Sequence, residues 1–449
     1  MTLILPFKGT RFNSRLIEDL SPVLAPPYDV ISPEYREELY QRHPNNVVRL
    51  ILSKESPEDD EYNNKYLRAG CLFQGWKRDG VLVEEDHKAI YLYEQEFSLP
   101  DGRICRRKGF FALVKLEEYA SGKVRAHEKT IAETKNDRLN LLQATQCNFS
   151  GIFMLYSDSD GKVNEVLESV RKRRTWEEVR SDDGIIHRLW VIKRAEPIRA
   201  LMDSLKPKDL FIADGHHRYE TALAYRDEKR KVTGRTDGKQ PFDYVMAFLC
   251  AFEEEGLVIL PTHRVINTEL ETDLTQEELK ETLAESFDLK PFKTDLSAPE
   301  KAVEKIFAEL ARLKKSDEDC GMVMVLPKGD AYAMKLKPDV SVDDLIEDDI
   351  HPAIKGLNLT ILHHYIINQV WVGNPDIELE KDDIFYERDP GRALKLLQDK
   401  RGAAAFFLDP LSPRKVKEIM ETGELLPPKS TFFYPKIITG LVMRDLQTN

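Results

Sequence analysis

The segment DGHHR, residues 214–218, holds the densest group of reactive side chains in the chain. The apolar run 210–213 before it predicts a short buried strand, and residues 216–231 predict a helix. A glycine turn at a helix start leaves backbone N–H groups free at the positive end of the helix dipole, which suits a phosphate. Arg218 could add a bidentate contact, and Asp214 could orient a histidine or hold Mg²⁺. The alternative interpretation is that Asp214 only caps the helix.

A zinc site in the same segment is the weaker hypothesis. His217 and Glu220 lie three residues apart and could share an ion, but His216 and His217 point about 100° apart on a helix. No HExxH spacing occurs in the chain. Phosphate binding is therefore preferred.

A second candidate is the pair His127 and Glu128, just before a helix expected from residue 134. A glutamate beside a phosphoryl donor can take the proton of an attacking hydroxyl, which contributes roughly 10²- to 10⁴-fold in rate. The alternative is an exposed capping residue.

Two later segments offer donors for a ligand. Residues 261–264 close a predicted strand, and a strand-end turn is the preferred interpretation; the alternative is that His263 and Arg264 form a cationic pair at the sheet's edge. The loop 427–436 is stiffened by prolines, so its donors could bind an anionic or amino-acid ligand at little entropic cost. The alternative is a packed loop.

Composition excludes several classes of protein. The 449 residues carry a net charge of −12, which disfavours binding to nucleic acid or to an anionic membrane. The longest apolar run, 244–252, is half the length of a membrane span, and the first residues lack the apolar core of a signal peptide. Five cysteines without a CxxC pair indicate reduced thiols, so we expect a cytoplasmic protein.

The elements that would position these residues alternate between strands and helices, which predicts an α/β fold with a mixed sheet. Strands are expected at 45–53, 89–99, 108–116, 244–252 and 256–265, with a hairpin turn at 100–102, and helices at 33–43, 275–286, 298–314 and 349–369. Three regions are predicted: 1–120, 121–270 with the His-Glu and DGHHR motifs, and 271–449 with the loop 427–436. No Walker sequence and no GxGxxG occurs, so a nucleotide would need a different phosphate cradle.

Together these motifs resemble the SerK-like free serine kinases of the ParB/sulfiredoxin superfamily. Within that group the chain is similar to a large bacterial and archaeal branch of unknown function, marked by PPYDV, HExT, ADGHHRY, LPTHR and PPKST. The resemblance implies a ParB/sulfiredoxin-like nucleotide-binding core in region 121–270. Because 86 residues (214 − 128) separate Glu128 from Asp214, it also implies an insertion at about 155–200.

The resemblance implies roles for particular residues. Glu128, beside His127, would be the general base, and Asp214 would help to hold Mg²⁺. The nucleotide phosphates would lie on Gly215, His216, His217 and Arg218, and the substrate on Lys429, Ser430 and Thr431, with His263 and Arg264 as further candidates. After Thr431 the kinases carry an arginine and a histidine, whereas this chain has Phe432 and Phe433.

The expected activity is therefore phosphoryl transfer from ATP or ADP to a small alcohol, with free L-serine as the favoured acceptor and O-phosphoserine as the product. One alternative is a ParB-like nucleotide-binding conformational switch, which needs no base. Another is a phosphatase or nucleotidase in which water replaces the serine hydroxyl. The acceptor, the donor, the metal and the oligomeric state stay open, and Asp29 of the PPYDV motif is favoured slightly as a site residue.

Overall fold

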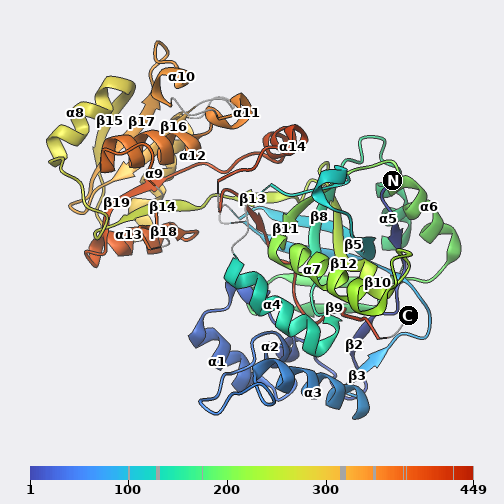
Figure 1. Ribbon diagram of the computed structural model, residues 1–449. Coiled ribbons are helices and arrows are strands. Elements are labelled where there is room, and N and C mark those ends of the chain that lie inside the picture. The colour runs from blue at the N-terminus through green and yellow to red at the C-terminus, as the bar shows by residue number, and fades with distance from the viewer. Residues whose placement is uncertain are drawn as a thin grey trace. The chain divides into compact units, whose positions relative to one another are not determined.

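The computed structural model describes residues 1–99, 102–127, 132–173, 175–313, 320–346, 350–377, 379–380, 382–427 and 429–447. The chain forms two compact units (Figure 1). Unit 1 comprises Met1–Val258 with Pro435–Asn449, and unit 2 comprises Ile259–Tyr434. This differs from the three regions predicted from the sequence, because strands from both sides of residue 120 pair within one sheet.

Unit 1 is built on a mixed sheet, which in the described residues has nine strands in the order β6-β11-β8-β12-β5-β4-β10-β9, with β1 beside β5. The pairs β6–β11 and β8–β12 are parallel, and the other pairs are antiparallel. These strands are β1 (Ile4–Leu5), β4 (Ile90–Ser98), β5 (Ile104–Lys115), β6 (Val124–Arg125), β8 (Ile152–Tyr156), β9 (Glu177–Arg180), β10 (Ile186–Ile192), β11 (Leu210–Asp214) and β12 (Tyr244–Ala251). Two short pairs lie outside the sheet: β2 (Thr10–Phe12) with β3 (Leu82–Glu84), and β7 (Cys147–Asn148) with β21 (Arg444–Asp445).

The central strands of unit 1 are buried on both faces, and successive side chains alternate between them. Leu92 and Phe110 belong to the core shared with helices α5, α6 and α7. Tyr93, Phe111 and Phe248 point the other way and form an aromatic cluster with ring centroids 5.3–5.5 Å apart. Aromatic and β-branched residues at both odd and even positions of a strand therefore produce strands with neither face exposed to solvent.

Helices of unit 1 pack on this sheet and on one another. They are α1 (Pro33–Arg42), α2 (Val48–Ile51), α3 (Lys65–Arg78), α4 (Ala132–Thr145), α5 (Lys162–Arg171), α6 (Ala195–Leu205) and α7 (His216–Thr233). Helix α4 packs against both α3 and α7 (Figure 1). Helix α4 thereby links α3 to α7, the helix that follows the DGHHR turn.

Unit 2 has an antiparallel sheet, with six strands described in the order β15-β17-β16-β19-β14-β18. Met322 and Met324 of β16 pack on one face, and Val323 and Val325 on the other. The strands are β14 (His263–Asn267), β15 (Phe287–Lys293), β16 (Gly321–Val325), β17 (Asp330–Leu336), β18 (Ile384–Glu387) and β19 (Gly402–Phe407). The helices are α8 (Gln276–Ser286), α9 (Pro299–Leu313), α10 (Val342–Leu345), α11 (Pro352–Lys355), α12 (Asn358–Thr360), a π-helix (Ile361–Val372), α13 (Pro390–Gln398) and α14 (Pro413–Thr422).

The mixed α/β fold predicted from the sequence is confirmed, and so is the hairpin, since Ser98 of β4 pairs with Ile104 of β5. Residues 100–101 of its turn lie outside the described residues. The predicted strand at 45–53 is wrong, because this segment forms α2. The predicted strand at 256–265 is divided into β13 (Val258–Leu260) and β14, because Pro261 has no N–H to continue a ladder. The helix predicted at 349–369 is broken into α11, α12 and the π-helix, with 347–349 outside the described residues.

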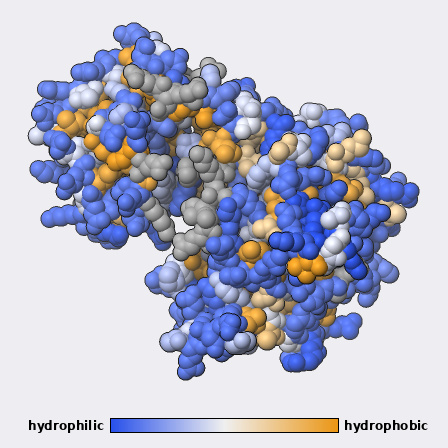
Figure 2. All heavy atoms as spheres, in the orientation of Figure 1, coloured by the Kyte–Doolittle hydropathy of each residue, from blue (hydrophilic) through white to orange (hydrophobic). Residues whose placement is uncertain are grey.

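Across the described part of the chain, every helix is too short or too polar to cross a lipid bilayer. On the face shown in Figure 2, hydrophobic side chains appear in small groups among hydrophilic ones.

Candidate functional site

The DGHHR turn has the geometry that the sequence predicts. Strand β11 ends at Asp214, Gly215 has a φ of 94°, and α7 begins at His216. Asp214 does not cap the helix, since Gly215 is the N-cap residue and has no side chain that could accept a hydrogen bond from the first turn. A helix start of this kind presents backbone N–H groups that can face an anion.

Asp214 instead forms two ion pairs. Its Oδ2 accepts a hydrogen bond from Arg218 Nη2 at 2.9 Å, and its Oδ1 is paired with Lys436 Nζ. Burial alone would raise the pKa of Asp214, but the charges of Lys436 and Arg218 outweigh it and hold the pKa below its usual range. The carboxylate is therefore ionised at neutral pH and held between two cations.

Lys436 comes from the C-terminal segment, which is held by two side chains of the sheet. Gln95 Nε2 donates to the carbonyl of Lys436 at 2.9 Å, and the fully buried Arg107 donates to the carbonyl of Pro435 and to Gln95 Oε1. The sequence did not single out Lys436 as a site residue; within the loop 427–436 the predicted site lysine was Lys429. The only sequence signal was a second lysine after the aromatic run of that loop.

Arg218 joins Asp214 to the start of β8. Its Nη1 donates to Ser150 Oγ at 2.8 Å and to the Gly151 carbonyl at 3.0 Å. A Cβ atom on Gly215 would lie 2.8 Å from Arg218 Nη2, so glycine is needed both for the positive φ and for this close approach. Of the five guanidinium N–H groups, two have no partner among the described residues and can reach a ligand.

His127 and His216 form a neutral pair beside the turn. His127 Nδ1 lies 2.6 Å from the Ile212 carbonyl, which can only accept, so Nδ1 carries the proton. The backbone N–H of His127 donates to His216 Nε2 at 3.4 Å, and the two rings are 4.7 Å apart. Burial lowers the pKa of His127 to about 4 and that of His216 well below its usual value. His127 therefore positions the chain that leads into Glu128, and Glu128 itself lies outside the described residues.

The PPYDV motif reaches the same place. Tyr28 and Asp29 form a 3₁₀ turn, and Asp29 Oδ2 lies 3.9 Å from Lys436 Nζ. Burial raises the pKa of Tyr28, with Arg218 and Arg138 opposing it. His217 is half-buried, and desolvation lowers its pKa. Unit 1 thus brings together Asp29, His127, the DGHHR turn and Lys436.

The other predicted site residues lie in unit 2. His263 and Arg264 begin β14, which is paired on both sides, and both are fully buried. Burial, followed by the charge of Arg264, lowers the pKa of His263 to about 4, so the alternative of a cationic pair at the sheet's edge is wrong. Arg264 Nη2 donates to the carbonyl of Lys429 at 3.1 Å, and Ser430 Oγ donates to the Pro427 carbonyl. LPTHR and PPKST are therefore in contact within unit 2, and a substrate role of Lys429, Ser430 and Thr431 stays a prediction.

The sequence predicts Asp214 as a ligand of Mg²⁺. Both of its carboxylate oxygens accept hydrogen bonds from cationic side chains, and each keeps a further lone pair. Among the described residues, His, Cys, Asp and Glu side chains nowhere gather in groups of three that could hold a metal. Because Mg²⁺ is usually held by one or two carboxylates together with substrate phosphates, a role of Asp214 in holding it stays a prediction.

These features define a mixed α/β protein with a polar cluster at a strand-to-helix turn. The chain belongs to the DUF1015 family of proteins of unknown function, which it matches over residues 4–360. No curated protein matches it significantly.

Solved structures resemble the chain only weakly. A mutant free serine kinase in complex with ADP is 13% identical, with a TM-score of 0.32 over 74% of this chain and 92% of that chain. A conserved hypothetical protein from Pyrococcus furiosus is 13% identical, with a TM-score of 0.30 over 74% and 95%. SbnI with a C-terminal truncation, from Staphylococcus aureus, is 10% identical, with a TM-score of 0.32 over 73% and 85%. TM-scores this low carry no argument about the fold or function of this chain.

Proposed function

We propose that this protein is a nucleotide-dependent phosphotransferase that acts on a small molecule, with free L-serine as the first acceptor to test. The observation that carries the proposal is the convergence of four distant motifs on one helix start. Asp29, His127, the DGHHR turn and Lys436 meet at the N-terminus of α7. The motif resemblance to SerK-like kinases, through a ParB/sulfiredoxin-like core, supports the same activity.

The phosphates of the nucleotide would lie on the first turn of α7, where the N-cap residue Gly215 has no side chain to compete for the N–H groups. Arg218 would use its two remaining N–H groups, and Lys436 would add a point charge. Such preorganised donors stabilise the charge that spreads over the phosphoryl oxygens in the transition state.

Glu128 is the proposed base, because it directly follows His127, which is held at the start of α7. In the proposed step the acceptor hydroxyl oxygen attacks the terminal phosphorus of ATP or ADP. The bond from that phosphorus to the nucleotide's bridging oxygen breaks, and the hydroxyl proton moves to the Glu128 carboxylate. Positioning by the enzyme supplies most of the rate enhancement in phosphoryl transfer.

The test is incubation of the purified chain with ATP or ADP, with and without L-serine, and with either Mg²⁺ or a chelator. Phosphoserine and nucleotide products are measured by mass spectrometry. We expect phosphoserine from the wild type and a loss of at least about 100-fold in Glu128→Gln. The matched control is Glu165→Gln, an exposed glutamate of α5.

Other outcomes would replace the proposal. Nucleotide hydrolysis without phosphoserine would indicate a phosphatase or nucleotidase. Nucleotide binding with no product of either kind would indicate a conformational switch, and Glu128→Gln would then leave binding unchanged.

A further inference from the structure

Unit 1 contains a cavity of about 70 Å³ beside Arg218 that the roles proposed above do not use. It lies between the Tyr28 turn, helix α4 and the segment 147–152. Its walls are formed by Tyr28, Ile51, Arg138, Leu141, Leu142, Cys147, Asn148, Phe149, Ser150, Ile152, Arg218, Thr221, Val245 and Thr439. Ligand sites commonly combine such an apolar lining with a few polar groups.

The charges in the cavity wall have one sign. Arg138 and Arg218 line it, and no aspartate or glutamate does. Arg218 also reaches Asp214 through Nη2 while its Nη1 lies on Ser150. One guanidinium group therefore connects the cavity with the start of α7, where the phosphate is proposed to bind.

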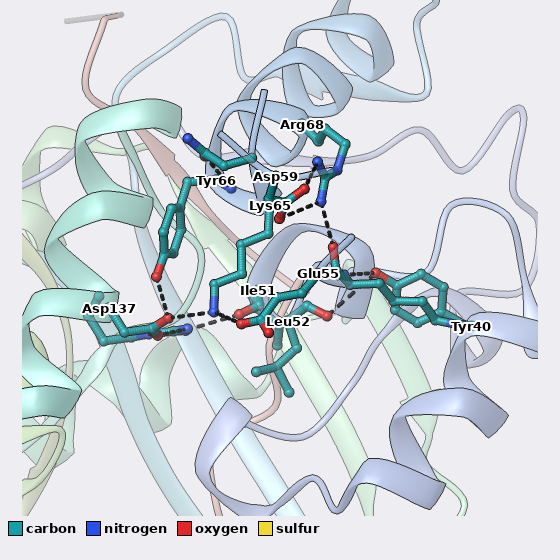
Figure 3. Close-up of polar contacts among 12 residues, drawn as sticks. Tyr40, Ile51, Leu52, Glu55, Asp59, Lys65, Tyr66, Arg68 and Asp137 are labelled. Atoms are coloured by element: carbon teal, nitrogen blue, oxygen red, sulfur yellow. Dashed lines mark hydrogen bonds and ion pairs between the residues drawn. The ribbon is translucent and has the colours of Figure 1, made fainter. Parts of the chain in front are cut away.

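Neighbouring residues hold the guanidinium group of Arg138 in place. Its Nε donates to Asp137 Oδ2 at 2.7 Å, its Nη1 donates to the Ile51 carbonyl at 3.0 Å, and its guanidinium lies 4.1 Å from the centre of the Tyr28 ring. Asp137 also accepts a hydrogen bond from Tyr66 at 2.8 Å, as Figure 3 shows. The cation in the wall is thus preorganised, which lowers the cost of binding an anion.

Three polar groups of the wall have no hydrogen-bond partner among the described residues. Thr439 Oγ1 is buried without one. Asn148 uses Oδ1 to accept from the Met246 N–H at 3.1 Å, and its Nδ2 has no partner in the described chain. The same holds for the hydroxyl of Tyr28. Buried polar groups are normally satisfied, so the buried Thr439 Oγ1 points to a bound molecule or water.

The volume limits what can bind. A water needs about 10–15 Å³ by this measure, so a cavity of about 70 Å³ has room for roughly five or six non-hydrogen atoms. A nucleoside has about three times as many atoms and does not fit. A small molecule with a carboxylate, a short apolar part and a hydroxyl matches the wall.

We propose that this cavity is the subsite for the phosphoryl acceptor, and that the acceptor is a small hydroxyl-bearing carboxylate. This inference rests on the proposed phosphotransferase function. The carboxylate faces the wall that contains Arg138, the carbon chain packs on Leu141 and Leu142, and the hydroxyl points to Arg218 and the phosphate beyond it. Acceptor selection would then be made within unit 1.

Calorimetric titration of the full chain with L-serine tests the subsite, with and without a non-hydrolysable ATP analogue. Tyr28→Phe and Thr439→Val each remove one hydroxyl with little change in shape. We expect each to weaken L-serine binding about 3- to 10-fold and to leave the Kd of the analogue unchanged. Matched controls are Tyr62→Phe and Thr233→Val, at exposed positions, which should change neither. L-serinamide, which lacks the carboxylate, should bind at least about 10-fold more weakly than L-serine.

The two proposals fail separately. If phosphoserine forms but neither wall variant raises the KM for L-serine, the cavity is not the acceptor subsite and the proposed function stands. If L-serine binds with the expected variant pattern but no phosphoserine forms under any condition, the proposed function fails and the cavity remains a carboxylate site. Absence of L-serine binding in both titrations, or equal affinity for L-serinamide, overturns the subsite.

Discussion

Lys436→Met is the most informative substitution in unit 1, because it removes one charge and keeps most of the side chain's length. The ammonium group pairs with Asp214 Oδ1 and lies 3.9 Å from Asp29 Oδ2. The backbone of residue 436 stays held by Gln95, whose amide donates to its carbonyl. The substitution therefore tests the ion pair and not the path of the chain.

The magnitude follows from burial. The side chains of Lys436 and Asp214 are 12% and 18% exposed, so solvent screens the pair little. Removing one partner of a buried pair costs about 3–5 kcal/mol. Because Arg218 still contacts Asp214, we expect the lower end, about 3 kcal/mol at pH 7.

Urea unfolding followed by tryptophan fluorescence measures this loss, since three of the four tryptophans, Trp76, Trp176 and Trp190, lie in unit 1, and Trp371 alone reports on unit 2. Lys429→Met is the matched control. Lys429 lies in the same loop, 427–436, but belongs to unit 2. We expect this substitution to leave the unit 1 transition unchanged.

A double-mutant cycle isolates the pair from other effects of the substitution. The cycle combines Lys436→Met with Asp214→Asn, and we expect a coupling free energy of at least about 1 kcal/mol. A coupling below about 0.5 kcal/mol would refute the reasoning. So would a loss of unit 1 stability in Lys429→Met as large as that in Lys436→Met.

Three further substitutions or conditions test the structure around the site. Gly215→Ala should destabilise the chain by at least about 1 kcal/mol and abolish nucleotide binding, because alanine is strained at this φ and its Cβ meets Arg218; thermal unfolding and calorimetry check this, and a variant of wild-type stability contradicts it. The pKa of buried His127 is about 4 in the folded protein and about 6.5 in the unfolded chain. Its contribution to the free energy of unfolding is therefore present above pH 6.5 and is lost as the pH falls towards 4, by about 2 kcal/mol between pH 7 and 5. The drop in stability over this range should be smaller in His127→Asn. Asn46→Ala should cost about 2–4 kcal/mol, because it leaves the carbonyls of Pro22 and Leu24 without their donor in a fully buried site; urea unfolding measures it, and a change below about 0.5 kcal/mol would contradict it.

The segment 45–53 shows where pattern reasoning fails. Its run of valine, leucine and isoleucine is typical of a strand, but a run buried all round has no period that separates a strand from a helix. The deciding residue is Asn46, whose Oδ1 accepts from the Val48 N–H at 2.9 Å and starts the turn. Its amide is held by carbonyls from a distant loop, so the tertiary contacts select the helix.

The histidines of the site show a similar limit. The position of His216 at the turn was predictable, because it directly follows Gly215, whereas only the tertiary structure brings His127 beside it. Their charge state was not predictable, since both imidazoles are made neutral by burial under elements that pack from elsewhere in the chain. The possibility of a cationic pair of His263 and Arg264 at the sheet's edge stayed open for a similar reason, because the sequence does not show that β18 and β19 flank β14.

What the sequence alone determined is the local geometry of the DGHHR turn, the proposed phosphate cradle. A buried strand (Leu210–Asp214), a glycine that accepts positive φ and a helix (His216–Thr233) follow one another directly, and short-range backbone preferences decide them. Only the tertiary structure decided the chemistry around that turn. Lys436 lies 222 residues from Asp214, and Ser150 lies 68 residues from Arg218. No local preference links such residues; the sheet order and the Gln95 and Arg107 contacts with residues 435–436 bring them together.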